Sequence, residues 1–406
     1  MKIKKKNLEC IIYTLMIFFV SFLNISSVHI PFYEKIRLIF AILLSIFMLV
    51  NIKIFIKREY CKINILLIII TCGTIYSTIL NKNLDTSSLY NTIMYLFKGI
   101  LIFFVLEYIS FIRKTKLCMK ILYVATMSFS ILSDVLMFII PSKFSVTDIS
   151  GIGNEFNSYL LGNKFNVVYF HIFATVFFIC LCEQKLLKKK LLLFLHMLIL
   201  FLVSLYTQCS TGVVATICLL GLYISKDFLI IRLKNCVSAI ISIVFFDCML
   251  LVNATILQIP TIANFIENVL KESSDLTGRL QIYKLTENAL KDSMWWGYGI
   301  DNNYAISQKF VHAANLQNGI LDYMISFGII GMILFLALII ITLKKGKESK
   351  NSLWMLLYIF IIISSVEVTF RSNFMCILAL IAFSSDRIEI NKRCINEKSY
   401  NNYSNL

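Results

Sequence analysis

Residues 319–343 read GILDYMISFGIIGMILFLALIIITL, and Asp322 is the only charged residue among them. A bilayer core about 30 Å thick needs roughly 20 apolar residues to be crossed by one helix. Inside hydrocarbon every backbone N–H and C=O must be hydrogen-bonded within the segment, which a single run achieves only as an α-helix. The stretch therefore predicts a transmembrane helix.

The rest of the chain repeats this pattern. Of the 406 residues 58% are hydrophobic and only 15% are charged, and the mean hydropathy is +0.80, a balance that a water-facing globular surface does not have. We therefore predict an all-α polytopic membrane protein with about 12 transmembrane helices, forming a single membrane-embedded domain over residues 1–406. The other predicted spans are 10–27, 37–52, 63–80, 91–112, 119–140, 165–182, 190–207, 211–225, 236–256, 352–370 and 373–385.

Lysine and arginine are distributed unevenly among the predicted loops. They recur in alternate loops, around residues 57–62, 113–116, 185–190, 232–234 and 344–350, and in the last twenty residues, whereas the loop from Asn81 to Asn91 is nearly free of them. Positive residues mark cytoplasmic loops. Both termini are therefore expected inside, with an even number of spans. The basic run from Lys2 to Lys6 resembles a signal peptide, but no cleavage site follows, so the first span is expected to stay as an anchor.

The net charge of +16 is explained by this topology, and we expect no nucleic-acid partner. The 12 cysteines lie in spans or on the inner side, where they serve as small apolar residues. The four histidines share no metal-ligand spacing, and there is no Gly-rich phosphate loop. No metal, no cofactor and no nucleotide-driven chemistry are expected.

Two outer segments interrupt the hydrophobic pattern, residues 141–164 and the large extracytoplasmic loop 257–318. Apolar residues at helical spacing predict short amphipathic helices in the large loop. Two of the three tryptophans, Trp295 and Trp296, stand there, followed by Asp301 and Tyr304. Aromatic rings beside amides and carboxylates suit stacking on sugar rings and bonding of their hydroxyls. An interfacial aromatic belt is the alternative interpretation.

The run TGRLQIYKLTENALKDSMWWGYGIDNNY (277–304), followed by LQNGILDYMISFGIIGMILFL (316–336), resembles the Wzy and O-antigen ligase superfamily of polysaccharide polymerases and ligases. The shared pattern is an Arg after a small residue (Arg279), a Gly-x-Gly turn (297–299), and a polar-Asn-x-x-Leu segment leading to Gly-x-x-Gly (328–331). The likeness implies a membrane glycosyltransferase architecture similar to the GT-C type.

Two positions differ from the ligases of this superfamily. Gln317 stands where a His is usual, and Ser210 is followed by Thr211 where a Ser-Arg pair is usual. His312 lies five residues before the expected position. Because polymerases of the superfamily vary more at these points, the differences favour a polymerase over a ligase.

The resemblance implies glycosyl transfer on the outer face of the membrane. The donor is a sugar chain on a polyprenyl (undecaprenyl-type) pyrophosphate, the acceptor is a second lipid-linked repeat unit, and no nucleotide is used. The leaving pyrophosphate requires fixed positive charge, for which Arg279 and Arg371 are the candidates. His312 is the candidate base, with Asp301 and Asp322 as rivals.

Further polar residues are candidates for substrate binding. Glu367 precedes Arg371 at the outer end of a span, where it can bind substrate or form a structural ion pair. Asn318 can cap the following helix or bond a sugar, and Asn163, in SGIGNEFNSYLLGNKFN (150–166), has the same two interpretations. The predicted substrate-binding set is Trp295, Trp296, Asp301, Tyr304, Asn318, Glu367 and Asn163.

The function predicted is a repeat-unit polymerase for a capsular or O-antigen-type polysaccharide in a bacterial cytoplasmic membrane. Its partners would be the lipid-linked oligosaccharide, membrane lipid, and a chain-length regulator and flippase. An O-antigen-ligase-type transferase is the nearest alternative. A flippase or transporter is a different class, but transporters show repeated halves and mid-membrane polar groups. A cell-wall glycan polymerase of the division machinery is the third alternative, and its acidic and Pro-containing signatures are not evident.

Overall fold

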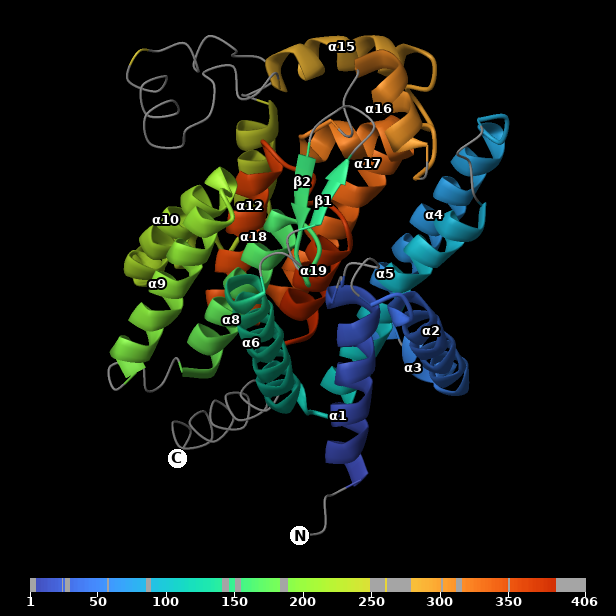
Figure 1. The fold of residues 1–406 in the computed structure, drawn as a ribbon. Coiled ribbons are helices and arrows are strands. Elements are labelled where there is room, and N and C mark those ends of the chain that lie inside the picture. Colours follow the sequence, from blue (N-terminus) through green and yellow to red (C-terminus); the bar gives the residue numbers. More distant parts are fainter. Residues whose placement is uncertain are drawn as a thin grey trace, which may run out of the picture.

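A computed structural model describes residues 5–23, 25, 30–56, 58–84, 89–140, 146–149, 155–182, 189–248, 260, 279–300, 302–311, 316–349 and 351–384. Helices dominate these residues (Figure 1). The predicted all-α polytopic architecture is confirmed.

Each of the twelve ranges predicted to span the membrane contains a helix. In chain order these are α1 (Lys5–Ile17) continued by the π-helix η1 (Phe18–Phe22), α2 (Tyr33–Val50), α4 (Arg58–Leu80), α5 (Leu89–Phe111), α6 (Thr115–Ile139), α8 (Lys164–Cys182), α9 (Lys190–Tyr206), α10 (Ser210–Ile224), α12 (Cys236–Ile243) continued by η4 (Val244–Cys248), α17 (Gly319–Lys345), α18 (Asn351–Ser364) and α19 (Ser372–Phe383). Short connecting helices are α3 (Ile52–Phe55), η3 (Lys226–Ile230), α11 (Ile231–Leu233) and η6 (Gly346–Glu348).

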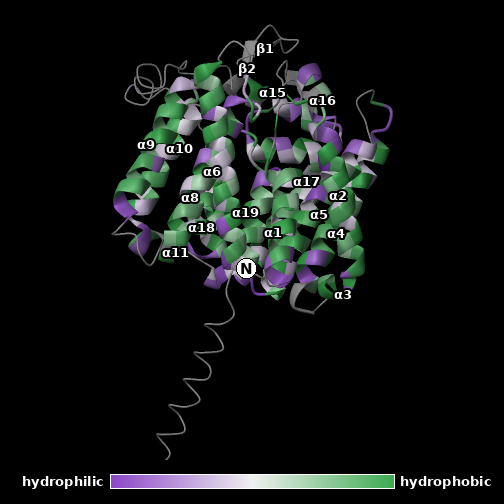
Figure 2. Ribbon diagram, turned by 60° about the horizontal axis from the view of Figure 1, so that its bottom comes forward, coloured by the Kyte–Doolittle hydropathy of each residue, from purple (hydrophilic) through white to green (hydrophobic). Residues whose placement is uncertain are grey.

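Length and hydropathy identify the helices able to cross a bilayer. Among the described residues five are long and apolar enough, or six if the pair Ser210–Ile224 and Lys226–Leu233, bent by 73°, forms one broken span. Four shorter apolar helices accompany them. In Figure 2 the helices of the bundle are coloured mainly as hydrophobic. The number of crossings, about 12, stays a prediction.

Two small elements lie on the segments that were predicted to be outside. Strands β1 (Val146–Ile149) and β2 (Glu155–Ser158) pair antiparallel as a short hairpin, which the sequence did not predict. Four residues per strand are too few to give a recognisable alternation. The large loop contains helices α15 (Arg279–Lys291) and α16 (Asn303–Val311), which lie beyond the end of α17 in Figure 1.

Some of the basic segments lie at one end of the bundle. At the start of α1, Glu9 accepts a hydrogen bond of 3.0 Å from the Tyr108 hydroxyl near the end of α5. The Lys345 ammonium, at the end of α17, lies 4.6 Å from the ring centre of Phe383 at the end of α19. Helix α15 and helix α16 lie at the opposite end (Figure 1). This segregation is the one expected from the positive-inside rule.

Helix α17 is broken near its middle. Gly328 has φ +66° and ψ −172°, which interrupts the helix, and the loop segment after α15 packs into the break. The backbone N–H of Tyr298 donates to Ile325 (2.7 Å), and the N–H of Ile329 donates to Met294 (2.9 Å). An alanine Cβ at Gly297 would stand 2.6 Å from the Gly328 nitrogen. The Gly-x-Gly turn is therefore required because two backbones touch there.

Candidate active site

A polar cavity opens toward the end of the bundle that bears the large loop. Its volume is about 360 Å³, within the range of small-molecule sites. It is enclosed by η1, the start of α2, the outer half of α5, the start of α8, and the linker between α18 and α19. Its lining residues are Val20, Ser21, Phe22, Leu23, Arg37, Tyr95, Lys98, Asn163, Phe165, Asn166, Tyr169, Phe360, Glu367, Val368, Thr369, Arg371, Ser372 and Asn373.

Three cationic side chains line this cavity, and each comes from a different element. Arg37 is on the second turn of α2, Lys98 is in the middle of α5, and Arg371 is the residue that precedes α19. Cations beside or within apolar helices are costly unless they face a cavity or a partner. Their convergence makes the cavity a site suited to an anion.

Arg371 is held by a carboxylate. Its NH2 group lies 3.2 Å from Oδ1 and 3.3 Å from Oδ2 of Asp322. The side chain of Asp322 is 8% exposed, whereas that of Arg371 is 50% exposed. The negative charge of Asp322 raises the pKa of the Arg371 guanidinium further. Arg371 therefore presents a permanent positive charge to the cavity.

Asp322 in turn is anchored from the outer loop. Asn303, the first residue of α16, donates its amide N–H to Asp322 Oδ1 (3.2 Å) and to the Ser326 hydroxyl (2.5 Å). Ser326 donates to the backbone carbonyl of Asp322 at 2.9 Å. An aspartate in a span is costly without a partner, and Asp322 has two, Asn303 and Arg371.

The side of the cavity formed by α8 carries hydroxyls and amides. Asn163 accepts a hydrogen bond of 3.0 Å from the backbone N–H of Asn166, which caps α8, so its predicted capping role is present and the residue also lines the cavity. Tyr169 is 7% exposed and Glu367 is 8% exposed. Such groups are typical of a surface that bonds hydroxyl groups of a ligand.

The two tryptophans of the large loop do not line this cavity. Trp296 packs edge-on against Tyr76 of α4, with ring centres 4.8 Å apart, and the Trp295 carbonyl accepts from the N–H of Ile330. The Trp295 side chain is 62% exposed. Their segment is seated on the break of α17, so any sugar contact they make lies outside the cavity.

Asn318 caps α17, which is one of the two roles that its position in the sequence suggested. Its Oδ1 accepts from the backbone N–H of Leu321 (3.0 Å), which makes it the N-cap of α17. Its side-chain N–H₂ donates to the carbonyls of Asp247 (3.4 Å) and Ser365 (3.2 Å). The residue is fully buried. Its side-chain amide is thus bonded within the protein, and the predicted substrate contact stays a prediction.

Four other predicted site residues lie wholly or partly outside the described part of the chain. His312 and Asp301 lie outside the described residues. Arg279 begins α15 and Tyr304 lies in α16, but both side chains lie outside the described part of the chain. Of the predicted site residues, the structure thus brings together Arg371, Glu367 and Asn163.

Two of the three cations that line the cavity were not predicted from the sequence. Lys98 interrupts the apolar run 91–112, and Arg37 begins the run 37–52. The available signal was the cost of placing a charge in a span, which marks a functional candidate by default. That rule was applied to Arg371 and not to these two residues.

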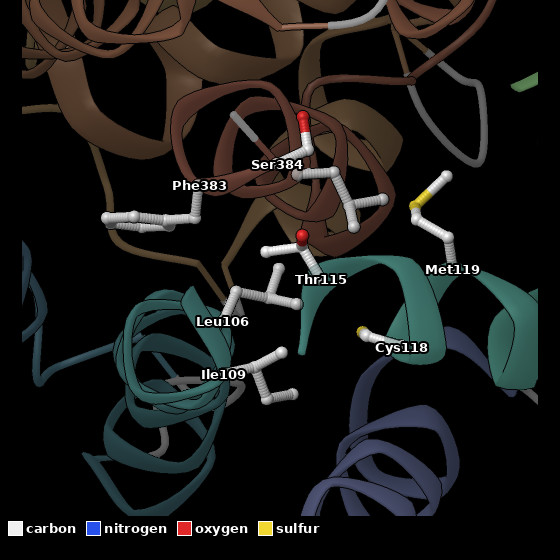
Figure 3. A pocket seen from close by; sticks show the side chains of 8 residues that line it. Leu106, Ile109, Thr115, Cys118, Met119, Phe383 and Ser384 are labelled. Atoms are coloured by element: carbon white, nitrogen blue, oxygen red, sulfur yellow. The ribbon is translucent and has the colours of Figure 1, made fainter. Parts of the chain in front are cut away.

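A second pocket lies at the opposite end of the bundle and is apolar. It holds about 10 Å³ and is lined by Leu106, Ile109, Thr115, Cys118, Met119, Leu380, Phe383 and Ser384. Figure 3 shows these side chains converging from α5, α6 and the end of α19. A space of this size admits about one water molecule, so it is a packing defect rather than a ligand site.

One buried histidine is paired with a carboxylate, and the described residues show no metal geometry. His171 of α8 lies 3.1 Å from a carboxylate oxygen of Asp134 in α6. Within the described residues no group of three or more His, Cys, Asp or Glu side chains could hold a metal ion.

Residues 167–336 match the family model described as O-antigen ligase. The matched segment runs from α8 through the large loop to the second half of α17. No curated protein and no solved structure matches the chain significantly. The family match confirms the resemblance found in the sequence and supports a membrane glycan-processing function in polysaccharide synthesis, acting on lipid-linked glycans. The match over residues 167–336 supports membership of the chain in the Wzy and O-antigen ligase superfamily.

Proposed function

We propose that this protein is a polymerase that joins polyprenyl-pyrophosphate-linked oligosaccharide repeat units into a surface polysaccharide. The observation that carries the proposal is the cavity of about 360 Å³. It combines fixed positive charge with a buried carboxylate and with amide and phenol groups. A glycosyl pyrophosphate needs both halves of that combination, a cationic site for the leaving group and hydrogen-bonding groups for the sugar.

The reaction assigns a role to each half. The acceptor hydroxyl gives its proton to a base as its oxygen bonds to the anomeric carbon of the donor. The bond between that carbon and the pyrophosphate oxygen breaks, and polyprenyl pyrophosphate leaves with the electron pair. Arg371 stabilises the developing negative charge through its planar donors. Glu367, which lines the same cavity close enough for its charge to act on Arg371, is the base that we propose.

The rival bases are His312 and Asp301 of the large loop. We propose that this loop covers the acceptor, with Arg279, Trp295, Trp296 and Tyr304 contacting its sugars from outside the cavity. Aromatic side chains provide a sequence-tolerant apolar face for sugar rings, and the exposure of Trp295 (62%) is consistent with that role.

Two differences from the ligases favour the polymerase. Gln317 replaces the usual His and has φ +48°, next to the cap Asn318. Thr211, in the first turn of α10, replaces the usual Arg. Without those two residues the ligase-type assignment of catalytic groups cannot be transferred. We further propose that the cavity end faces outward from a bacterial cytoplasmic membrane, because the basic loops lie at the other end.

The test is reconstitution with a single substrate class. Purified protein in liposomes that contain only lipid-linked repeat units, with no nucleotide, should produce a ladder of longer lipid-linked chains. Glu367→Gln should slow chain growth by about 100-fold or more, the usual contribution of a general base. Glu348→Gln is the matched control, because Glu348 is exposed at the opposite end of the bundle.

Each other outcome identifies a different protein. Transfer of glycan only to an added acceptor without pyrophosphate would identify a ligase. Movement of unpolymerised units across the liposome membrane would identify a flippase. Full activity in Glu367→Gln, with loss in His312→Ala, would move the base into the large loop.

A further inference from the structure

The N-terminal side of the cavity holds polar groups that have no role in the chemistry described so far. Ser21 is on η1, Arg37 is on α2 and Lys98 is on α5. All three lie outside residues 167–336, the segment matched by the family model.

Two of these side chains have buried polar atoms that lack partners. Ser21 is 7% exposed, and its hydroxyl has no hydrogen-bond partner among the described residues. The same holds for Nε of Arg37, whose side chain is 14% exposed. A buried donor left without a partner destabilises the folded protein, because it has lost its hydrogen bonds to water. Both residues line the same cavity, and a small side-chain rotation would bring either donor to an acceptor bound there.

The local backbone explains why Ser21 is available. Residues 18–22 form one turn of π-helix, which closes with the N–H of Leu23 bonding to Phe18 at 2.8 Å. The Tyr33 hydroxyl donates to the carbonyl of Phe19 at 2.8 Å and so joins this turn to the start of α2. Single π-helical turns are often found at functional sites.

The charge of this group is positive even after its internal pairing. Arg37 NH1 lies 2.6 Å from Oε1 of Glu34, and its NH2 donates to the Val20 carbonyl at 3.4 Å. Lys98 makes no ion pair or hydrogen bond among the described residues, and its charge interacts with those of Arg37 and Glu34. One Arg and one Lys against one Glu leave a net charge of +1. A neutral sugar would not require it.

We propose that Ser21, Arg37 and Lys98 form a phosphate subsite for the lipid-linked phosphate of a polyprenyl pyrophosphate. This deepens the proposed function, on which it rests. The sugar-linked phosphate then lies at Arg371, and the sugar lies toward Asn166 and Glu367 on the other side of the cavity. The subsite fixes the direction of the donor, with its lipid end toward η1 and α2. The exposed apolar side chains of α2, such as Ile39 (55%) and Leu43 (47%), provide the surface that a polyprenyl tail needs there.

Direct binding tests the subsite without depending on polymerisation. The probe is farnesyl pyrophosphate, titrated into the full-length purified protein in a neutral detergent. Lys98→Met and Ser21→Ala are each expected to weaken binding by about tenfold, as lost charge-assisted or buried hydrogen bonds do. Methionine matches the length of lysine and is at home in apolar surroundings, so Lys98→Met should keep the fold, which a thermal unfolding midpoint checks.

Three comparisons sharpen the experiment. Lys98→Arg should retain affinity, because the charge is preserved. Lys82→Met, which removes an exposed cation from the loop between α4 and α5, should bind as the unaltered protein does. Farnesyl monophosphate should bind more weakly than the pyrophosphate to the unaltered protein and should lose less in Arg371→Gln.

Other binding results would overturn the phosphate subsite or change its assignment. Unchanged affinity in both Lys98→Met and Ser21→Ala would overturn the subsite. If these variants weaken binding of short-chain phosphatidylglycerol as much as that of the pyrophosphate, the group is a general site for phospholipid headgroups. If farnesyl pyrophosphate binds as expected but no polymer forms in the reconstitution, the subsite stands and the polymerase proposal fails.

Discussion

The carboxylate of Asp322 holds the guanidinium of Arg371 at 3.2 Å, and it is itself held by Asn303 of the large loop at 3.2 Å. A buried anion thus connects α16, α17 and the residue before α19. Because only the Arg371 end of this chain of contacts lines the cavity, Asp322 acts through Arg371. We regard it as a positioning residue.

Replacing Asp322 by asparagine should lower kcat by about 10- to 100-fold, with a smaller rise in KM for the donor. The volume is preserved, but Arg371 loses the charge that orients it, and interactions that strengthen in the transition state are lost mainly from kcat. The measurement is the initial rate of chain growth per folded molecule as a function of donor concentration.

Two further variants separate positioning from folding. Asp322→Glu keeps the carboxylate and should recover part of the rate. Asp292→Asn removes an exposed carboxylate of the large loop and should change nothing. A variant Asp322→Asn with normal kcat and only a smaller folded fraction would show that the contact is structural.

Gly297→Ala should destabilise the protein by about 1–3 kcal/mol, the usual cost of a forced backbone conformation. Gly297 has φ +69°, and a Cβ there would meet the backbone of Ser326, Phe327 and Gly328 at 2.6 Å. The thermal unfolding midpoint in detergent should fall. Gly221→Ala is the control with the opposite sign, because no atom lies within 4 Å of its Cβ position and alanine favours the helix by about 1 kcal/mol.

Asn318→Ala should cost more stability than Asn235→Ala, although both residues are N-caps. Asn235 is exposed and accepts one hydrogen bond from Val237 at 3.1 Å, so its loss should cost about 1 kcal/mol. Asn318 is fully buried and also donates to Asp247 and Ser365, whose carbonyls would be left unsatisfied. If Asn318→Ala and Asn235→Ala lower the unfolding midpoint equally, the hydrogen bonds of Asn318 to Asp247 and Ser365 add no stability.

The fold could be predicted from the sequence because lipid imposes one solution on an apolar run. The run 165–182 became α8 (Lys164–Cys182) almost to the residue. The break of α17 could not be predicted, because Gly328 stands in an uninterrupted apolar run. Its conformation depends on hydrogen bonds with residues 294–299, some thirty positions earlier in the chain.

The site was predicted in part. Glu367 and Arg371 were found because charges stand out at the end of a span, and both line the cavity. Arg37 and Lys98 were missed because each was read as part of an apolar run, and only tertiary structure brings α2 and α5 to one cavity. Trp295 and Trp296 were predicted to bind sugars; Trp296 packs on Tyr76 outside the cavity, and the sugar contact stays a prediction.

The N-cap of α17 also determines where the chain can accept inserted residues. The side-chain amide of Asn318 donates to the carbonyl of Asp247, which precedes the large loop, and to the carbonyl of Ser365, which follows α18. The chain between Asp247 and Asn318 therefore starts and ends at the same fixed point, whatever its length. Lengthening such an excursion costs only about 0.6 kcal/mol for each doubling. An insertion in this segment that leaves residues 279–311 unchanged should therefore keep the register of the helices below, because the contacts of residues 294–303 with α17 are preserved.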